Sequence, residues 1–170
     1  MFDDFKKLLS IFNAQKDKYL IVGSYAVSFH AQPRATADID LLIKPNAENA
    51  RAVYAALSEF GASLEGLTAG NFIERDKFFR MGQAPLMVDI LPEIGGVDFD
   101  SAWQRRVEAV IDSQSGLKAS FISSQDLIAA KLAAGRAQDI ADVAALRKAA
   151  ESRGGRSRKK RPAPDPKKSG

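Results

Sequence analysis

The amino-acid sequence predicts a mixed α/β fold, because of the order in which helical and extended patterns follow one another. A helix–strand–turn–helix–strand unit opens the chain, strands with hairpin-like spacing occupy its middle, and two helical segments follow them. A doubly wound parallel sheet would instead need a regular alternation of strands and helices. With 170 residues, 45% of them hydrophobic, the chain is long enough for one compact domain with a small appendage.

Hydrophobic spacing assigns the elements of the first half. A helix over roughly 2–15 carries apolar side chains at helical intervals, namely Phe2, Phe5, Leu8, Leu9 and Phe12. The elements expected next are a strand over 19–22, a short helix over 24–31, a strand over 38–43 and a helix from the cap Asn46 to about Phe60. Gly61 supplies a stop for that last helix.

The second half begins with residues 62–71, which have a loop-like composition. The elements expected after them are strands over 77–80 and 86–91 joined by a hairpin turn, a short helix over 99–104, strands over 106–111 and 117–122, and helices over 123–134 and 138–151. Ser123 is the expected cap of the first closing helix, and Gly135 is expected to break it.

Three parts follow from this order: a core over 1–122, a helical pair over 123–151 packed on the core, and a basic tail over 152–170. The tail is rich in Gly, Ser, Arg, Lys and Pro and is expected to be disordered. The chain's net charge of +4 combines this strongly basic tail with a mildly acidic remainder, since the tail holds eight of the 25 lysines and arginines. Two interpretations stay open: the tail recruits RNA, or it is a solvated extension without a target.

Composition excludes several classes of site. Without cysteine, the chain has no disulfide, no thiolate zinc site and no cysteine nucleophile. The acidic start is unlike a secretory signal, and no apolar run is long enough to span a bilayer, so we expect a cytoplasmic protein. Walker A, dinucleotide-binding, metalloprotease and protein-kinase motifs are also missing from the sequence.

Two aspartates in an otherwise apolar strand are the main indication of function. Asp38 and Asp40 share one face of the expected strand 38–43, because strand side chains alternate in direction. Like charges about 7 Å apart along a strand repel unless a cation lies between them. Oxygen ligands without nitrogen or sulfur favour magnesium.

A phosphate-binding turn is expected beside this pair. Gly23 follows the strand 19–22 and permits both a tight turn and a close approach of phosphate. The helix that starts at Ser24 directs free N–H groups to the same point, and the serine adds a hydroxyl donor. A third carboxylate, Asp89, joins the aspartate pair if strand 86–91 lies beside strand 38–43. Three carboxylates would then hold two Mg²⁺ ions about 3.5–4 Å apart.

Together, the segments 22–24, 38–40 and 88–90 resemble the three signature motifs of the DNA polymerase β-like nucleotidyltransferase superfamily. The longer segments 23–26, 34–40, 126–131 and 136–143 resemble minimal nucleotidyltransferases and the abortive-infection toxins of type IV toxin–antitoxin systems. The resemblance covers roughly residues 15–148. It implies a polymerase β-like fold: a small mixed sheet flanked by helices, with a C-terminal helix pair.

The resemblance also implies roles for residues. Asp38, Asp40 and Asp89 would bind metal, Asp89 would help to activate the acceptor hydroxyl, and Gly23 and Ser24 would hold the triphosphate. The chain departs from many relatives at 29–33, where it lacks a glycine after the motif helix. Its C-terminal part leaves little room for a large acceptor-binding domain.

Four further polar residues, Arg34, Thr36, Lys131 and Asp139, are candidates for nucleotide binding, each with an alternative interpretation. Arg34 and Thr36 precede the metal strand; Arg34 either reaches phosphate or is a surface charge. Lys131 and Asp139, in the closing helices, either approach the triphosphate or form a salt bridge between these helices. Asp142 is expected to be structural.

The expected function is that of a Mg²⁺-dependent nucleotidyltransferase, which moves an NMP from an NTP such as ATP to an acceptor hydroxyl. The acceptor is an RNA, a protein or a small molecule, and a toxin role with an antitoxin partner follows from the resemblance alone. The alternative is a catalytically silent nucleotide-binding or interaction module of the same fold.

Overall fold

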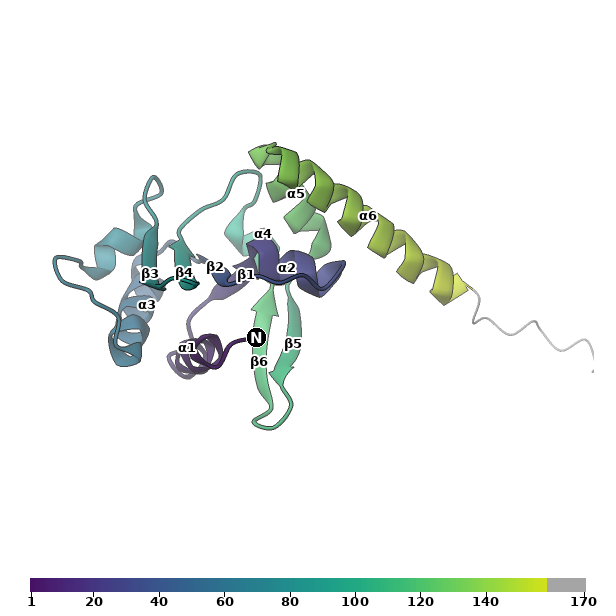
Figure 1. The fold of residues 1–170 in the computed structure, drawn as a ribbon. Coiled ribbons are helices and arrows are strands. Elements are labelled where there is room, and N and C mark those ends of the chain that lie inside the picture. The colour runs from purple at the N-terminus through teal and green to yellow at the C-terminus, as the bar shows by residue number, and fades with distance from the viewer. Residues whose placement is uncertain (159–170) are drawn as a thin grey trace, which may run out of the picture.

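The computed structural model describes residues 1–158 (Figure 1) and confirms the mixed α/β prediction. Its six-stranded sheet has the order β3-β4-β2-β1-β6-β5. The strands are β1 (Tyr19–Val22), β2 (Asp38–Ile43), β3 (Phe79–Gln83), β4 (Leu86–Leu91), β5 (Val107–Asp112) and β6 (Leu117–Phe121). The pairs β2–β4 and β1–β6 are parallel and the other three neighbouring pairs are antiparallel, so the sheet is mixed.

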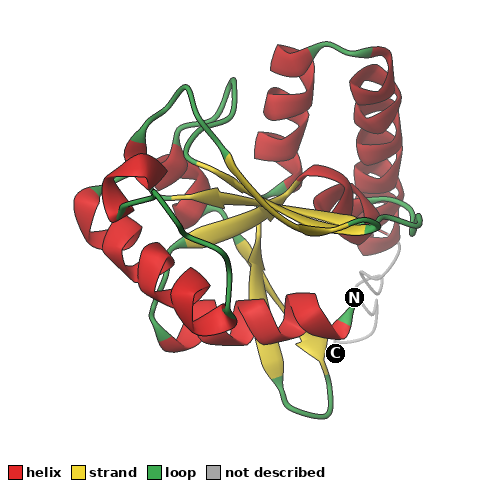
Figure 2. Cartoon of the chain, turned by 60° about the vertical axis from the view of Figure 1, so that its left-hand side comes forward, coloured by secondary structure: helices red, strands yellow, loops and turns green. Residues whose placement is uncertain are grey.

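Helices cover both sides of this sheet (Figure 2). They are α1 (Asp3–Ala14), α2 (Gly23–His30), α3 (Ala47–Phe60), the 3₁₀ turn η1 (Ala69–Ile73), α4 (Phe99–Gln104), α5 (Ser124–Ala134) and α6 (Ala137–Arg158). Helices α1 and α3 pack together on one side, and the antiparallel pair α5–α6 stands on the other side with α2. None of the helices in residues 1–158 is both long and apolar enough to cross a membrane.

The main core lies between the sheet and the helices α1 and α3. The expected apolar stripe of α1 is buried at Phe5, Leu8, Leu9 and Phe12, as are Ile39, Leu41 and Ile43 on one face of β2. The opposite face of β2 carries Asp38 and Asp40. The alternation of side chains along β2 therefore directs one face into the core and leaves the other for polar chemistry.

The expected helix caps are confirmed. Asn46 accepts a hydrogen bond from the Asn49 N–H, and Ser123 accepts one from the Asp126 N–H. Gly61 and Gly135 end α3 and α5 in the left-handed conformation, which glycine adopts without steric cost. Local turn chemistry thus fixes where α3 and α5 begin and end.

Three boundaries differ from the sequence prediction. The first hairpin strand runs over Phe79–Gln83 rather than 77–80, and η1 occupies part of the expected loop 62–71. Helix α6 continues to Arg158, seven residues beyond its expected end, so residues 152–158 are helical rather than disordered. The glycines at 154 and 155 lower helix propensity by about 1 kcal/mol each relative to alanine but do not end the helix. The rest of the expected tail, 159–170, lies outside the described residues.

Candidate functional site

The three predicted carboxylates lie on one face of two adjacent strands. Strands β2 and β4 are parallel neighbours, and their register places Asp40 directly opposite Asp89. Asp38 shares the face of Asp40 because it lies two residues earlier on β2. The expected pairing of 86–91 beside 38–43 is therefore confirmed.

Gly23 joins these carboxylates to the start of α2. Its φ of +60° is rare for residues with a side chain, and a β-carbon there would lie 1.9 Å from Oδ2 of Asp40. The last residue of β1, Val22, is paired with Asp40 in the sheet. Glycine is therefore required where the N-terminus of α2 meets the aspartate, and the free N–H groups of this helix lie beside the carboxylate.

Negative charge accumulates around Asp40. Burial raises the pKa of the Asp40 carboxyl, and the neighbouring charges of Asp89 and Asp38 raise it further, while Lys131 and Arg80 oppose the shift. Among residues 1–158, neither Asp38 nor Asp40 has a side-chain hydrogen bond or ion pair that would neutralise it. A cation placed between the two would relieve this repulsion.

Asp89 is already paired, which the sequence did not predict. Nε of Arg80 donates to Oδ1 of Asp89 and Nη2 donates to Oδ2, both at 2.6 Å. The residues face each other across the β3–β4 pair. In the described part of the chain, no three acidic or histidine side chains are placed to hold a metal ion together. The expected cluster of three metal-binding carboxylates is therefore not assembled, because a guanidinium occupies the third.

The donors that remain fit one magnesium ion. Asp38 and Asp40 offer hard, anionic oxygens that face an open side of the sheet, and Mg²⁺ in nucleotide sites commonly uses one or two carboxylates together with substrate phosphates. The residues present therefore suit a metal whose coordination a bound nucleotide would complete.

Arg34 reaches the turn at the start of α2. Its Nη2 donates to Oγ of Ser24 at 2.8 Å, and its Nη1 donates to Oδ1 of Asp142 at 2.7 Å. The structure thus brings Arg34 to the predicted phosphate turn, with its guanidinium fixed by a carboxylate. Thr36 instead donates to the backbone carbonyl of Asp38, at 3.2 Å, and supports the loop before β2.

A buried ion-pair network connects α5 with α6. Nζ of Lys131 lies 3.0 Å from carboxylate oxygens of both Asp139 and Asp142, and these two aspartates are at most 2% exposed. Of the two interpretations of Lys131 and Asp139, the structure shows the salt bridge between the closing helices, and their binding of nucleotide stays a prediction. Asp142 is structural, as expected: it is buried, and its ion-pair partners are Lys131 and Arg34.

Arg136 completes this network and was missed by the sequence reasoning. Its guanidinium and its backbone N–H both donate to the Asp139 carboxylate. Hydrogen bonds from Arg136 and Lys131 hold the pKa of Asp139 well below its usual range. The sequence did contain a signal for this contact. Asp139 follows Arg136 by three residues at the start of a helix, which is the spacing at which a side chain reaches back to the backbone N–H of the cap residue.

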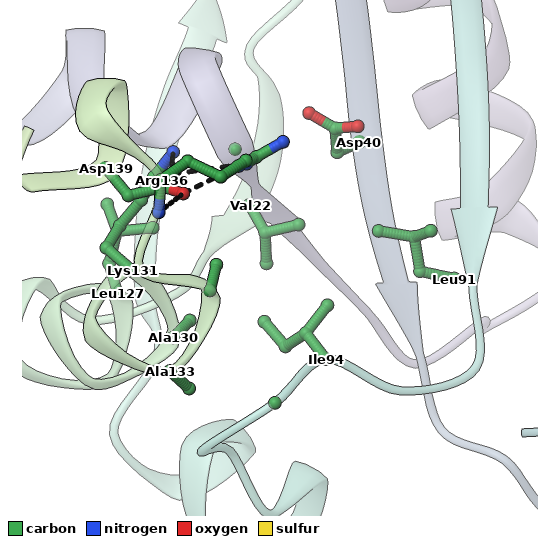
Figure 3. A pocket seen from close by; sticks show the side chains of 13 residues that line it. Val22, Asp40, Leu91, Ile94, Leu127, Ala130, Lys131, Ala133, Arg136 and Asp139 are labelled. Carbon is green, nitrogen blue, oxygen red and sulfur yellow. Dashed lines mark hydrogen bonds and ion pairs between the residues drawn. The ribbon is translucent and has the colours of Figure 1, made fainter.

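A cavity of about 400 Å³ opens between these groups (Figure 3). Its polar side holds Asp40, Gly23, Lys131, Arg136 and Asp139. Its other walls are apolar or small: Val22, Leu91, Ile94, Gly95, Leu127, Ala130, Ala133 and Ala134. Figure 3 shows Asp40 across the cavity from Lys131 and Arg136, with Ile94 and Leu91 along another wall. A pocket with charge at one side and apolar walls suits a ligand that is part anionic and part hydrophobic.

A solved structure shares this fold. A lincosamide antibiotic adenylyltransferase, LnuA, with lincomycin bound, superposes with a TM-score of 0.56 at 18% identity, over 86% of this chain and 96% of that one. A putative nucleotidyltransferase from Thermotoga maritima, TM1012, gives a TM-score of 0.47 at 16% identity, over 91% of each chain. No curated protein matches the sequence.

The family is shown by a sequence model that covers most of the chain. The model matches residues 1–148, which include the turn at Gly23, both strands that carry the aspartates, and the helix pair up to Lys148. The chain therefore belongs to the family described as "Nucleotidyltransferase of unknown function (DUF6036)".

Proposed function

We propose that this protein is a Mg²⁺-dependent nucleotidyltransferase that moves an NMP from an NTP to an acceptor hydroxyl and releases pyrophosphate. One observation carries the proposal. The start of α2 at Gly23 touches Asp40, which faces Asp89 on the adjacent strand, so an anion-binding helix start and metal-type ligands share one place.

The chain's own residues supply the positioning. Asp38 and Asp40 would hold the metal, which when bound neutralises phosphate charge. The free N–H groups at the start of α2 and the hydroxyl of Ser24 would bind phosphate oxygens, and Arg34 orients that hydroxyl. Phosphoryl transfer depends mainly on such positioning and charge stabilisation, and it requires no histidine or cysteine.

Positive charge on the α5–α6 side has a matching role. Lys131 and Arg136 line the cavity opposite Asp40, and Asp139 holds both. Phosphates bound between the aspartates of β2 and these two cations would place the nucleoside against the apolar walls of the cavity. Asp139 therefore acts as a positioning residue and would not touch the nucleotide.

The acceptor is the narrower part of the proposal. LnuA is described as acting on a lincosamide antibiotic, which supports testing small hydroxylated molecules. The basic segment from Arg153 onward supports testing RNA. A role as a toxin with an antitoxin partner rests on the sequence resemblance alone.

A catalytically silent module of the same fold is the second candidate, and the Arg80–Asp89 pair favours it because it occupies a carboxylate that catalysis would use. Incubation of a cell extract with the protein, Mg²⁺ and each α-³²P-labelled NTP separates the two candidates. We expect label to appear on an acceptor, and to be lost in Asp40→Asn but not in Asp3→Asn, whose side chain is 98% exposed. Unlabelled extract with every NTP would leave the silent module as the better description.

A further inference from the structure

Arg80 and Asp89 form a forked ion pair with unequal partners. Both carboxylate oxygens accept hydrogen bonds at 2.6 Å, so the guanidinium covers the edge of the carboxylate. The side chain of Asp89 is 9% exposed, whereas that of Arg80 is 52% exposed. The Arg80 side chain can therefore swing out into solvent, whereas the Asp89 side chain is held by its buried surroundings.

The position of Arg80 in the sheet supports this difference. Strand β3 is the edge of the sheet and pairs only with β4, whereas β4 is held on both sides. Besides Asp89, the Arg80 guanidinium lies 5.7 Å from the centre of the Phe78 ring, and Phe78 is itself 59% exposed. The aromatic ring offers a cation a second, solvent-exposed resting place.

Charge explains why the pair forms. Asp38, Asp40 and Asp89 share one face of β2 and β4, and the strand register places Asp40 opposite Asp89. Arg80 pairs with Asp89, whereas Lys131, which lines the cavity with Asp40, is engaged with Asp139 and Asp142. Arg80 is thus the cation on the sheet itself that balances the three acids.

We infer that Arg80 is a built-in counter-ion that competes with a divalent cation for Asp89. While the guanidinium holds both oxygens of Asp89, a divalent ion finds only Asp38 and Asp40. When Arg80 turns away, the third carboxylate becomes a ligand for a further cation or a partner for the acceptor hydroxyl. This inference rests on the proposed function for the identity of the site, but it concerns binding and not turnover.

A second ion pair of the same shape provides a matched control. Arg105 donates to both oxygens of Asp126, at 3.0 and 2.6 Å, and the exposures are 46% and 9%. Asp126 is near the start of α5, where it also accepts a hydrogen bond from the hydroxyl of Ser123. Arg105→Gln therefore frees a buried carboxylate in the same way, but on α5 rather than on the strands that carry Asp38 and Asp40.

The test is Mn²⁺ binding without nucleotide, measured by the electron paramagnetic resonance signal of free Mn²⁺. We expect Arg80→Gln to bind Mn²⁺ at least about tenfold more tightly, or to bind one more ion, than the unchanged protein, because removal of a nearby positive charge favours a cation. Arg105→Gln should match the unchanged protein. Arg80→Gln combined with Asp89→Asn should lose the gain.

Equal Mn²⁺ binding in Arg80→Gln and the unchanged protein overturns the inference, as does a gain that survives Asp89→Asn. If Arg80→Gln fails to fold, Arg80→Lys replaces it, since lysine keeps the charge but loses the fork, and a smaller gain is expected. Label transfer by the unchanged protein is measured in parallel. If the unchanged protein transfers label but Arg80→Gln binds Mn²⁺ no more tightly, only this inference is wrong. If Arg80→Gln binds Mn²⁺ more tightly but the unchanged protein transfers no label, only the proposed function is wrong.

Discussion

Gly23 and Asp40 lie so close that the site has no room for a side chain between them. A β-carbon on Gly23 would stand 1.9 Å from Oδ2 and 2.8 Å from Cγ of Asp40. The carboxylate belongs to β2, whose residues on either side are fixed in the sheet, so it has little freedom to withdraw. The phosphate turn and the metal ligand are therefore one packed unit.

Gly23→Ala tests this contact. We expect it to lose nucleotide binding and to lower the free energy of unfolding by about 1–3 kcal/mol, because it combines a strained φ with a collision. Thermal unfolding and nucleotide titration measure the two effects. Gly61→Ala is the control: its φ is +94°, but a β-carbon there meets nothing within 4 Å. It should lose stability from strain and keep nucleotide binding, and a Gly61→Ala variant that also loses binding would show that strain alone explains the result.

The sequence predicted the elements of the site better than their contacts. Alternation along 38–43 placed Asp38 and Asp40 on one face, because strand geometry determines that outcome locally. The pairing of Asp40 with Asp89 was conditional, since neighbouring strands are chosen by the whole sheet. Arg80 lies in a segment with no motif. Its bond to Asp89 depends on how β3 pairs with β4, and β3 begins two residues later than the sequence predicted.

The helix pair shows the same limit. Lys131 and Asp139 were recognised as candidates and Asp142 was expected to be structural, but the spacing of Lys131 and Asp139 did not decide between phosphate binding and a salt bridge. The crossing of α5 and α6 makes the salt bridge, and it also brings Arg34 from a distant loop to Asp142. The cavity walls were not predicted, because alanines and leucines in helices are equally consistent with a packed core.

Asp17 predicts a dependence of stability on pH. The residue is 5% exposed, neither carboxylate oxygen has a hydrogen-bond partner among the described residues, and burial raises its pKa to about 7. Because the folded state holds the proton more tightly than the unfolded state, stability is highest below the usual pKa of 3.8 and falls as pH rises towards 7. The rise in pH across this range lowers the free energy of unfolding by on the order of 4 kcal/mol through Asp17.

Denaturant unfolding at pH 5 and pH 8 checks this dependence in the unchanged protein and in Asp17→Asn. Asparagine cannot ionise, so the variant should lose less stability than the unchanged protein between these two pH values. Asp3→Asn, at a fully solvated position of α1, should leave the difference as it is. A pH dependence that Asp17→Asn does not reduce would mean that Asp17 is ionised in the folded protein at pH 5.

Lys131→Met tests the network between the closing helices. It leaves Asp139 and Asp142, at 0% and 2% exposure, without their shared cation, although Arg136 and Arg34 still reach one each. Breaking a buried ion pair by removing one partner costs about 3–5 kcal/mol, and the remaining arginines should keep the loss near the lower value. Lys148→Met, on the exposed side of α6, is the control, and chemical unfolding of both variants at pH 7 measures the difference.

The same network predicts behaviour in acid. Hydrogen bonds from Arg136 and Lys131 to Asp139, and from Lys131 and Arg34 to Asp142, lower the pKa of these carboxyls. Their contribution to stability is present above the usual aspartate pKa of 3.8 and is lost as pH falls through the lowered values. Lys131→Met should therefore weaken the acid sensitivity of unfolding below pH 4. If the dependence of unfolding on pH below pH 4 is the same in Lys131→Met, other carboxyl groups cause the acid sensitivity.

Ala130→Leu tests whether the cavity beside Asp40 holds the nucleotide. Ala130 faces the cavity from α5, and a leucine would occupy space between the helix and the apolar wall that includes Leu91 and Ile94. Leucine and alanine both favour helices, so the expected effect is on binding rather than folding. We expect nucleotide affinity, measured by calorimetric titration of the protein with an NTP and Mg²⁺, to fall at least about tenfold, roughly 1.4 kcal/mol.

Ala144→Leu, on an exposed face of α6, makes the same change away from the cavity and should leave affinity unchanged. If Ala130→Leu binds NTP as the unchanged protein does, the nucleoside lies elsewhere, and the apolar walls have another ligand.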